Sequence, residues 1–448
     1  MKFCVINGSP RGEYSITLQT LLYLEKLYPE HRFDFLNVAA EIRRFEKDMT
    51  VAIEKINDCD AIIFSYPVYT FLAPSQLHKF IELLKTSDVD LSNKFVTQIT
   101  TSKHFYDVTA HNYINENCFD LNMKVIKGLS LDMEDLTKQD GQEYVKNFFN
   151  FVMHCIENNI FEEGVTTDST IDEKYSKELS FIEKNETKEI AIVADIEDDD
   201  HRLKAMIEEF VAGFPYKVKI YNIRKFEFAG GCLGCFNCAA SGKCIYNDKF
   251  DNFLRGNIQQ SDAIVYAFTI KDHSMGSLFK MFDDRQFCNG HRTVTEKMPI
   301  AYIVNGQYNK EQNLKTVIEA RAEVGGNYLA GVAYDCETLK QTINKLSYAI
   351  KNKYSQPRNF YGVGGMKIFR DLIWVMRGIM KADHMYYRSH KIYDFPQKQR
   401  AKMMLLCVLG AMMRNPKIKA KMGNKFNEGM IAPYKKVLKE LDEKKSHD

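Results

Sequence analysis

The stretch Asp-Ala-Ile-Ile-Phe at residues 60–64 has a near copy in Asp-Ala-Ile-Val-Tyr at residues 262–266. In both, an acidic residue precedes a short apolar run, which is typical of a strand buried on both faces of a sheet. Around each copy, further strand-like runs alternate with segments of helical periodicity. A pattern that recurs at so long a period indicates an internal duplication. We therefore expect two α/β domains in tandem, each a parallel sheet covered by helices on both faces.

Each half supplies five strand candidates and five helix candidates. In the first half, strands are expected at residues 2–7, 33–38, 61–66, 95–100 and 124–129, and helices at 15–28, 45–57, 75–84, 109–117 and 141–157. In the second half, strands are expected at residues 189–194, 217–222, 263–268, 300–305 and 328–333, and helices at 202–214, 250–260, 277–287, 314–324 and 337–352. The fold prediction is α/β, with two tandem doubly wound parallel five-stranded sheets plus a C-terminal helical region.

Composition sets the predicted domain boundaries. Residues 166–187 are mostly polar and charged, so we interpret them as a linker between a domain at 1–165 and a second at 188–352. Residues 353–448 carry 21 Lys and Arg against 8 Asp and Glu, and predict a basic helical C-terminal region with helices at 366–380 and 403–413. We expect the glycines of residues 362–365 to form a loop before the first of them. Such helices can dock on the acidic body of the same chain, on a membrane surface or on an acidic partner protein.

The bulk numbers exclude several classes of protein. A formal net charge of +2 gives no reason to expect a nucleic-acid partner. No apolar run reaches the roughly 18 residues of a transmembrane segment, and Met1-Lys2 leads directly into a strand-like run, with no leader pattern. The 11 cysteines are an odd number, and seven of them are scattered through apolar segments. This usage is typical of reduced thiols, and we expect a cytoplasmic protein.

Three loops at the ends of predicted strands carry the candidate cofactor site. The loop after the first strand, residues 7–17, is rich in hydroxyls and small residues and leads into a helix, the pattern of a phosphate site. The loop after the third strand, residues 65–71, holds a proline and aromatic rings that could stack on a flat ring system. Residues 100–102, after the fourth strand, add hydroxyl donors at the same edge. Together they predict a mononucleotide with a large flat ring, held by Ser9, Arg11, Ser15, Thr17, Pro67, Val68, Tyr69, Thr70, Thr101 and Ser102.

Four cysteines stand within thirteen residues of the second half, with the spacing C-x2-C-x2-C-x5-C: Cys232, Cys235, Cys238 and Cys244. Thiols this close cannot all pair in unstrained disulfides, but they can all face one centre, as ligands of an iron–sulfur cluster do. Zinc usually takes two well-separated C-x2-C pairs or a histidine, and is a second interpretation. A loop that keeps its cysteines without any metal is a third.

These residues resemble the flavodoxin-like NAD(P)H-dependent FMN reductases and, more narrowly, the iron–sulfur flavoproteins. The resemblance is carried by GSPRGEYSIT at residues 8–17, SYPVYTFLAPSQLHKFIE at residues 65–82 and the cysteine group at 232–244. It implies flavodoxin-like sheets, an FMN whose phosphate lies in the first loop, NAD(P)H as co-substrate, and a 4Fe-4S cluster on the four cysteines. The implied function is an oxidoreductase that passes electrons from NAD(P)H through FMN to the cluster or to a small acceptor such as a quinone. No side chain is assigned a catalytic role, since the cofactor carries the chemistry.

Each half departs from the family pattern in a different way. The first half has no cysteine group, while the first loop of the second half, residues 194–200, holds carboxylates that would repel a phosphate. Because relatives in this family are commonly dimers, we expect an intramolecular pseudo-dimer in which the first half binds FMN and the second brings the cluster; a further homodimer stays open. Two other functions stay open as well: a flavodoxin-type electron carrier that serves a redox partner protein without its own NAD(P)H site, and a flavin-free scaffold.

Overall fold

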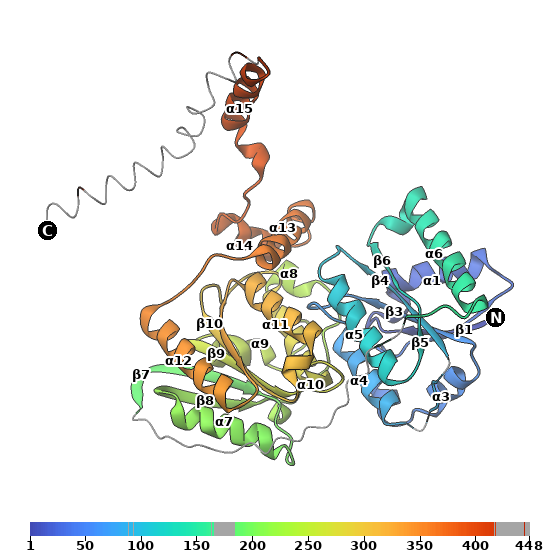
Figure 1. Cartoon of the computed structure of the whole chain (residues 1–448), viewed down its shortest axis with the longest axis horizontal. Coiled ribbons are helices and arrows are strands. Elements are labelled where there is room, and N and C mark those ends of the chain that lie inside the picture. Colours follow the sequence, from blue (N-terminus) through green and yellow to red (C-terminus); the bar gives the residue numbers. More distant parts are fainter. Residues whose placement is uncertain are drawn as a thin grey trace. The chain divides into compact units, whose positions relative to one another are not determined.

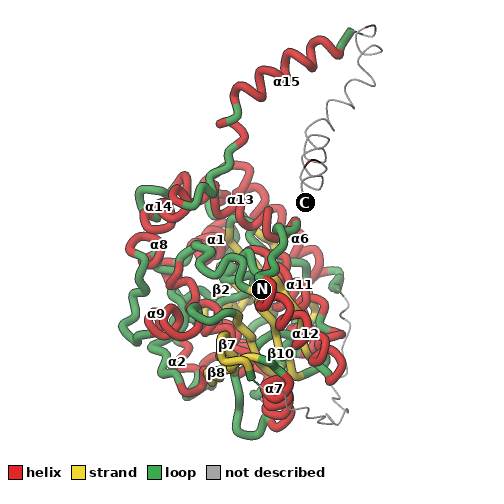
Figure 2. The backbone as a smooth tube through the Cα atoms, turned by 90° about the vertical axis from the view of Figure 1, so that its left-hand side faces the viewer, coloured by secondary structure: helices red, strands yellow, loops and turns green. Residues whose placement is uncertain are grey.

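The computed structural model of the chain describes residues 1–162 except 88 and 93, residue 164, residues 184–415, and residues 417 and 443. Most of the predicted linker, residues 166–183, lies outside these residues, and the three predicted domain boundaries stay predictions. Two compact units are present, Met1–Tyr387 and Arg388–Asp448. The first unit holds two parallel sheets with helices on both sides of the strands (Figures 1 and 2).

The first sheet has the order β2-β1-β3-β4-β5. Strand β6 also pairs with β4, nearer to the carboxyl end of β4 than β5 does. All its strand pairs are parallel. This is the strand order of flavodoxin-like domains, in which ligands bind at the carboxyl ends of the strands. The strands are β1 (Lys2–Asn7), β2 (Arg32–Leu36), β3 (Ala61–Pro67), β4 (Phe95–Ser102), β5 (Lys124–Val125) and β6 (Leu129–Asp132), and the helices are α1 (Ile16–Leu27), α2 (Ile42–Phe45), α3 (Thr50–Asn57), α4 (Ser75–Lys85), α5 (Asp107–Asp120) and α6 (Gln139–Glu157).

The second sheet repeats this order. Its strands run β11-β10-β9-β7-β8, which is the same 2-1-3-4-5 arrangement counted from β7. Its strands are β7 (Asn185–Ala194), β8 (Tyr216–Asn222), β9 (Ala263–Thr269), β10 (Pro299–Asn305) and β11 (Tyr328–Ala333), and its helices are α7 (His201–Gly213), α8 (Asn237–Ser241), α9 (Phe250–Phe253), α10 (Gly276–Arg285), α11 (Gln312–Gly325) and α12 (Cys336–Asn352). The predicted fold class, two tandem flavodoxin-like sheets followed by helices, is confirmed.

The duplicated stretch that begins at Asp60 and Asp262 has the same structural role in both halves. The carboxylate of Asp60 accepts the backbone N–H of Lys2 at 2.7 Å, and that of Asp262 accepts the backbone N–H of Glu189 at 2.9 Å. Each aspartate therefore ties the start of the third strand to the start of the first strand of its own sheet. The repeated aspartate in the sequence therefore makes the same hydrogen bond in both halves.

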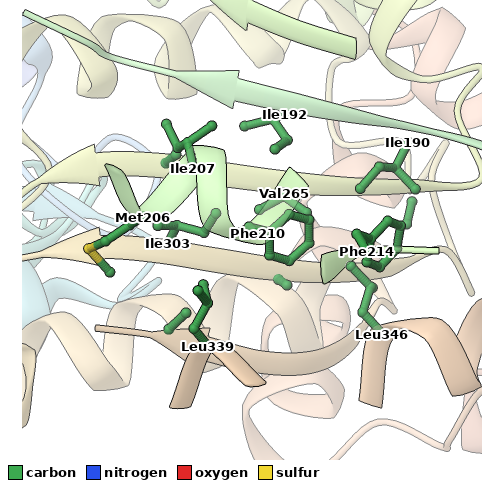
Figure 3. Close-up of a cluster of buried hydrophobic side chains, with 14 of the residues drawn as sticks. Ile190, Ile192, Met206, Ile207, Phe210, Phe214, Val265, Ile303, Leu339 and Leu346 are labelled. Atoms are coloured by element: carbon green, nitrogen blue, oxygen red, sulfur yellow. The ribbon is translucent and has the colours of Figure 1, made fainter. Parts of the chain in front are cut away.

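Both sheets bury apolar side chains under helices on one face. In the second half, Phe210 of α7, Phe214 just after this helix and Leu346 of α12 pack on Ile192 and Val265 of the sheet (Figure 3). In the first half, α1 and α6 cover the equivalent face. Burial of this much apolar surface is the main stabilising contribution to each domain.

The opposite faces of the two sheets meet through equivalent helices. Helix α4 of the first half packs against α10 of the second, and α5 packs against α11 (Figure 1). Each inner helix caps its counterpart: Asp284 accepts the N–H of Ser75 at 3.0 Å, and Glu82 accepts the N–H of Ser277 at 2.7 Å. Reciprocal contacts of this kind are the mark of a two-fold interface between like subunits.

Several local predictions need correction. The strand expected at 124–129 is interrupted, so that β5 and β6 pair separately with β4 and the first sheet counts six strands. The helix expected at 45–57 is two helices, because the carboxylate of Asp48 accepts the N–H of Thr50 and starts α3 afresh. The helix expected at 250–260 begins as α9 and continues as a π-helical segment over Leu254–Ile258.

The C-terminal helices are α13 (Phe360–Val375), α14 (Lys381–Ser389) and α15 (Arg400–Met413). The glycines at 362–365 lie inside α13, so the predicted loop there was wrong. A Cβ on Gly362 would lie 2.5 Å from the carbonyl oxygen of Glu323, and one on Gly365 would lie 2.6 Å from the side chain of Val324. The glycines are needed because α13 packs closely on α11. In the part of the chain that the structure describes, no helix is long and apolar enough to cross a membrane.

Candidate functional site

The loop between β1 and α1 is shaped by a buried asparagine. The Asn7 amide donates to the carbonyl oxygen of Gly12 at 3.1 Å, and its Oδ1 accepts the N–H of Ser9 at 3.2 Å. Gly12 has a φ of +54°, which glycine adopts without strain. Ser15 caps α1 by accepting the N–H of Leu18 at 3.3 Å. The loop therefore presents backbone donors and hydroxyls at a helix N-terminus, the arrangement that suits an anion.

A hydroxyl contact joins this loop to the end of β4. Thr17 Oγ1 and Thr101 Oγ1 lie 2.6 Å apart, and both side chains are buried. Ser102 is the last residue of β4, and its side chain adds an uncharged hydroxyl at this edge. The first and fourth strand ends thus meet at one edge of the sheet, as the sequence predicted from the parallel arrangement.

The loop after β3 forms a tight turn with an unusual backbone. Tyr69 and Leu72 exchange hydrogen bonds of 2.8 and 3.0 Å, and the two residues between them, Thr70 and Phe71, have φ values of +40° and +71°. Non-glycine residues in this region are strained and persist only where their surroundings hold them. Phe71 is held by its buried ring, which packs 4.4 Å from the ring of Tyr106.

Thr70 is held by an ion pair from the second half of the chain. Its hydroxyl donates to Asp284, whose carboxylate pairs with Lys280 one helical turn earlier, and both charged side chains are fully buried. The Lys280 ammonium also donates to the carbonyl oxygen of Tyr69 at 2.9 Å. Burial raises the pKa of Asp284, and the lysine acts against that rise. The turn that carries Tyr69 is therefore positioned by a charge pair on α10.

The cysteine loop lies directly against Tyr69. A Cβ on Gly234 would lie 1.9 Å from the Tyr69 hydroxyl, and the Gln76 amide donates to the carbonyl oxygen of Cys232 at 3.3 Å. The loop turns back on itself through positive φ values at Gly234 and Phe236, both +61°. Burial raises the pKa of Tyr69 well above its usual range, and the nearby Cys232 and Asp284 act in the same direction.

One cavity gathers every residue that the sequence proposed for a cofactor. Its wall includes the ten predicted flavin residues from the first half and the four cysteines from the second: Ser9, Arg11, Ser15, Thr17, Pro67, Val68, Tyr69, Thr70, Thr101, Ser102, Cys232, Cys235, Cys238 and Cys244. The three loops and the cysteine group are far apart in the sequence, so their meeting is a property of the fold. The roles assigned to the individual residues stay proposals.

The four thiols share this wall without forming a closed metal site. Within the described residues, no group of three or more His, Cys, Asp or Glu side chains is arranged to hold a metal ion. Burial raises the pKa of Cys232 well above its usual range and that of Cys238 to about 12, and the neighbouring cysteines add to both shifts. Cys235 is exposed and the other three cysteines are half-buried, and as thiolates on one cavity wall the four would repel one another. An iron–sulfur centre supplies the positive charge that relieves this repulsion, so the donor set fits such a group.

One side of the cavity, which we call the roof, comes from α13, and sequence reasoning missed it. Ile368, Phe369 and Leu372 of α13 line the cavity. The Phe369 ring stacks on Phe105 at 4.5 Å and meets the edge of His291 at 4.8 Å. The apolar spacing of α13 was visible in the sequence, but its partner was not. These three side chains make this side of the cavity apolar.

Helix α14 fixes this roof through one buried carboxylate. Asp383 is fully buried and accepts the backbone N–H of His291 at 3.1 Å and its ring Nδ1 at 2.9 Å. Arg292 pairs with the same carboxylate at 3.3 Å. Gly290 has a φ of +61°, and a Cβ there would lie 2.2 Å from Asp383. These contacts hold the His291 segment against the cavity.

The equivalent position in the second half is filled by its own side chains. The turn from Lys271 to Ser274 repeats the Tyr69 turn, with positive φ at the two residues between them. Lys271, which takes the place of Tyr69, pairs with Glu197 of the first loop. Arg224 pairs with Asp195 of the same loop at 2.6 Å. Carboxylates and their cations thus occupy the place where a phosphate would lie.

Other polar and charged side chains near the helices between the two halves have structural partners. His273 does not line the cavity; it lies between Asp120 and Glu311, with both separations at 3.0 Å. Asp283 pairs with Arg321 at 2.7 Å, and Arg285 pairs with Asp248 at 2.8 Å. These pairs hold the two halves and the cysteine segment together.

A parallel sheet of this order, with a cavity at the carboxyl ends of its strands, defines the flavodoxin-like class of α/β domains. Residues 1–134 match the family model described as NADPH-dependent FMN reductase. The match spans the whole first sheet, from β1 to β6.

Two curated relatives are iron-sulfur flavoproteins. One, from Archaeoglobus fulgidus, is 25% identical over 171 residues, which are 35% of this chain and 77% of the relative. The other, from Clostridioides difficile, is 31% identical over 103 residues, which are 22% of this chain and 44% of the relative. The chain therefore spans less than half of the second relative.

Among solved structures, similarity extends over about one third of the chain. General stress protein 14 of Treponema denticola, in complex with FMN, is 11% identical with a TM-score of 0.29, and the match covers 34% of this chain and 98% of that protein. An FMN-dependent NADH-azoreductase of Bacillus anthracis, in complex with FMN, is 12% identical with a TM-score of 0.28, and covers 36% and 100%. Here the strand order within each sheet, not these scores, establishes the fold.

Proposed function

We propose that the protein is an NAD(P)H-dependent FMN oxidoreductase that passes electrons through FMN to an iron–sulfur cluster or to a small acceptor such as a quinone. The observation that carries this proposal is the single cavity lined both by the three predicted flavin loops and by the four cysteines. When bound, FMN supplies two-electron exchange with a nicotinamide and one-electron exchange with a metal cluster.

In this proposal the first half of the chain binds and orients the flavin. The loop of Ser9, Arg11 and Ser15 receives the phosphate on backbone donors, hydroxyls and one positive charge. Residues Pro67–Thr70 would hold the flat ring, and the turn at Tyr69 is fixed by the pair of Lys280 and Asp284. Thr101 and Ser102 supply hydroxyls at the end of β4.

The second half brings the cysteines and no second flavin. Cys232, Cys235, Cys238 and Cys244 would hold a 4Fe-4S cluster in the same cavity, on the Tyr69 side of the site. The first loop of this half is filled by paired carboxylates, so we expect one FMN per chain. The reciprocal helix caps support an origin as a fused pair of subunits, an intramolecular pseudo-dimer.

The roof of α13 bears on the acceptor. Ile368, Phe369 and Leu372 offer apolar surface and no charge, which suits a flat, weakly polar molecule such as a quinone. A cytoplasmic location is supported by the cysteines, all of which are free thiols.

The test is an absorption spectrum of protein purified without air, with FMN, iron and zinc quantified per chain. One FMN and about four irons, with broad absorbance near 400 nm that bleaches on reduction, are expected. Turnover is then followed with NADH and NADPH against a quinone. Zinc or no metal would remove the cluster from the proposal. FMN with iron but no oxidation of either nicotinamide would indicate a flavodoxin-type carrier, and failure to take up FMN would overturn the function.

A further inference from the structure

Helix α15 is an apolar helix with exposed side chains. Residues 403–413 read MMLLCVLGAMM and contain no charged side chain. Met404 is 72% exposed, Leu405 59% and Val408 58%. With about 100° between successive residues, the exposed positions fall on every side of the helix. A helix that is apolar all round is stable only when an apolar medium or protein core surrounds it.

The sequence around α15 is uniformly basic. Residues 395–427 contain eight lysines and arginines and no aspartate or glutamate. Lys398, Arg400 and Lys402 precede the apolar run, and Arg414 and Lys417 follow it closely. Positive charge at both ends of an apolar helix complements a surface of anionic lipid headgroups, where each Lys or Arg near the surface adds attraction.

The length of α15 decides how it could meet a membrane. Its 14 residues rise about 21 Å, less than the roughly 30 Å of a bilayer core. We propose that α15 is a membrane anchor that embeds in one leaflet of an anionic membrane without crossing it. The apolar side chains enter the boundary of the acyl chains, and the flanking basic residues stay among the headgroups.

The pattern favours lipid over a protein occupant. A helix that pairs with a second copy of itself or with a folded surface carries one apolar stripe and a polar face for water. Residues 403–413 have no polar face at all. A fluid apolar phase can surround such a helix, with basic residues needed only at its two ends.

Vesicle flotation of the full chain tests the proposal. We expect it to float with vesicles of phosphatidylcholine containing about 30% phosphatidylserine, and only weakly with pure phosphatidylcholine or at high salt, as for other basic anchors. The variant L405E/L406E should lower the partition coefficient about tenfold or more, because two apolar side chains are lost from the interface. The matched double control V108E/Y144E adds the same charge at side chains 67% and 58% exposed, on α5 and α6, and should float like the parent.

Several results would overturn the anchor. These are no flotation with anionic vesicles, flotation unchanged in L405E/L406E, or equal binding to neutral and anionic vesicles. A lipid-free dimer that L405E/L406E converts to monomer would assign α15 to a second copy, and binding to an acidic protein but not to lipid would assign it to a protein partner. FMN content and far-UV circular dichroism, measured on each variant, should not change, so a folding defect or a failed flavin assignment is recognised separately.

Discussion

Replacing Asp284 with asparagine should destabilise the contact between the two halves strongly. Asp284 and Lys280 are both fully buried, and the carboxylate accepts the N–H of Ser75 at 3.0 Å as well as the Thr70 hydroxyl. In D284N the amide can still accept the Ser75 N–H, but the Lys280 ammonium stays buried without its counter-charge. Removing one partner of a buried ion pair lowers the free energy of unfolding by about 3–5 kcal/mol. Because D284N keeps an acceptor for the Ser75 N–H, we expect a loss of about 3 kcal/mol.

The assay is urea denaturation, followed by far-UV circular dichroism and by flavin fluorescence, with D284N, K280M and K280M/D284N compared with the parent. The double variant has no charge left to bury, so we expect it to recover about 2 kcal/mol or more relative to D284N. The control is E41Q, in an ion pair whose side chains are 58% and 40% exposed, where a cost below about 1 kcal/mol is expected.

The same variants report on the Tyr69 turn. Because Asp284 and Lys280 hold Thr70 and the carbonyl oxygen of Tyr69, D284N should also weaken FMN binding, while E41Q should not. If D284N costs no more than E41Q, or if the double variant is no more stable than D284N, the charge pair does not organise this interface and the reasoning is refuted.

Three further outcomes are expected. Burial opposes the charged form of His273, but hydrogen bonds to Asp120 and Glu311 raise its pKa from 6.5 to about 10. The contribution of this histidine to stability is therefore complete below pH 6.5 and is lost as the pH rises to about 10. H273Q should flatten the fall of the unfolding midpoint across that window, and an unchanged slope would count against the pairing. G234A places a Cβ 1.9 Å from the Tyr69 hydroxyl at a φ of +61° and should lower both FMN affinity and metal content, with partial recovery in G234A/Y69F, where the hydroxyl is absent. C238S should reduce iron per chain in anaerobic preparations while FMN stays near one per chain; full iron content would exclude Cys238 as a ligand.

The strands could be predicted from the sequence because both sheets are buried on their two faces. Apolar runs such as 61–66 and 263–268 have the length of a buried strand and are shorter than a usual helix. Boundaries failed where one polar contact overrides the periodicity, as at Asp48, whose carboxylate begins a new helix inside a predicted one. The break between β5 and β6 lies at residues 126–128, where Gly128 was a signal of interruption that the predicted strand at 124–129 ran through.

The cavity wall could be predicted only in part. Loops at strand ends converge in any parallel sheet, which is why Ser9, Tyr69 and Thr101 were found together. The α13 roof and Asp383 depend on long-range packing that leaves no local pattern. The glycines of α13 were a signal of that packing, but a glycine run is equally typical of a loop.

The cavity draws its wall from both halves of one polypeptide. In an assembly of separate subunits, such a shared site would come apart on dilution, and its occupancy would follow protein concentration. Covalent linkage instead holds the second half at a high effective concentration beside the first. Specific activity should therefore be constant down to nanomolar enzyme, and one damaged half should disable its own chain without affecting any other.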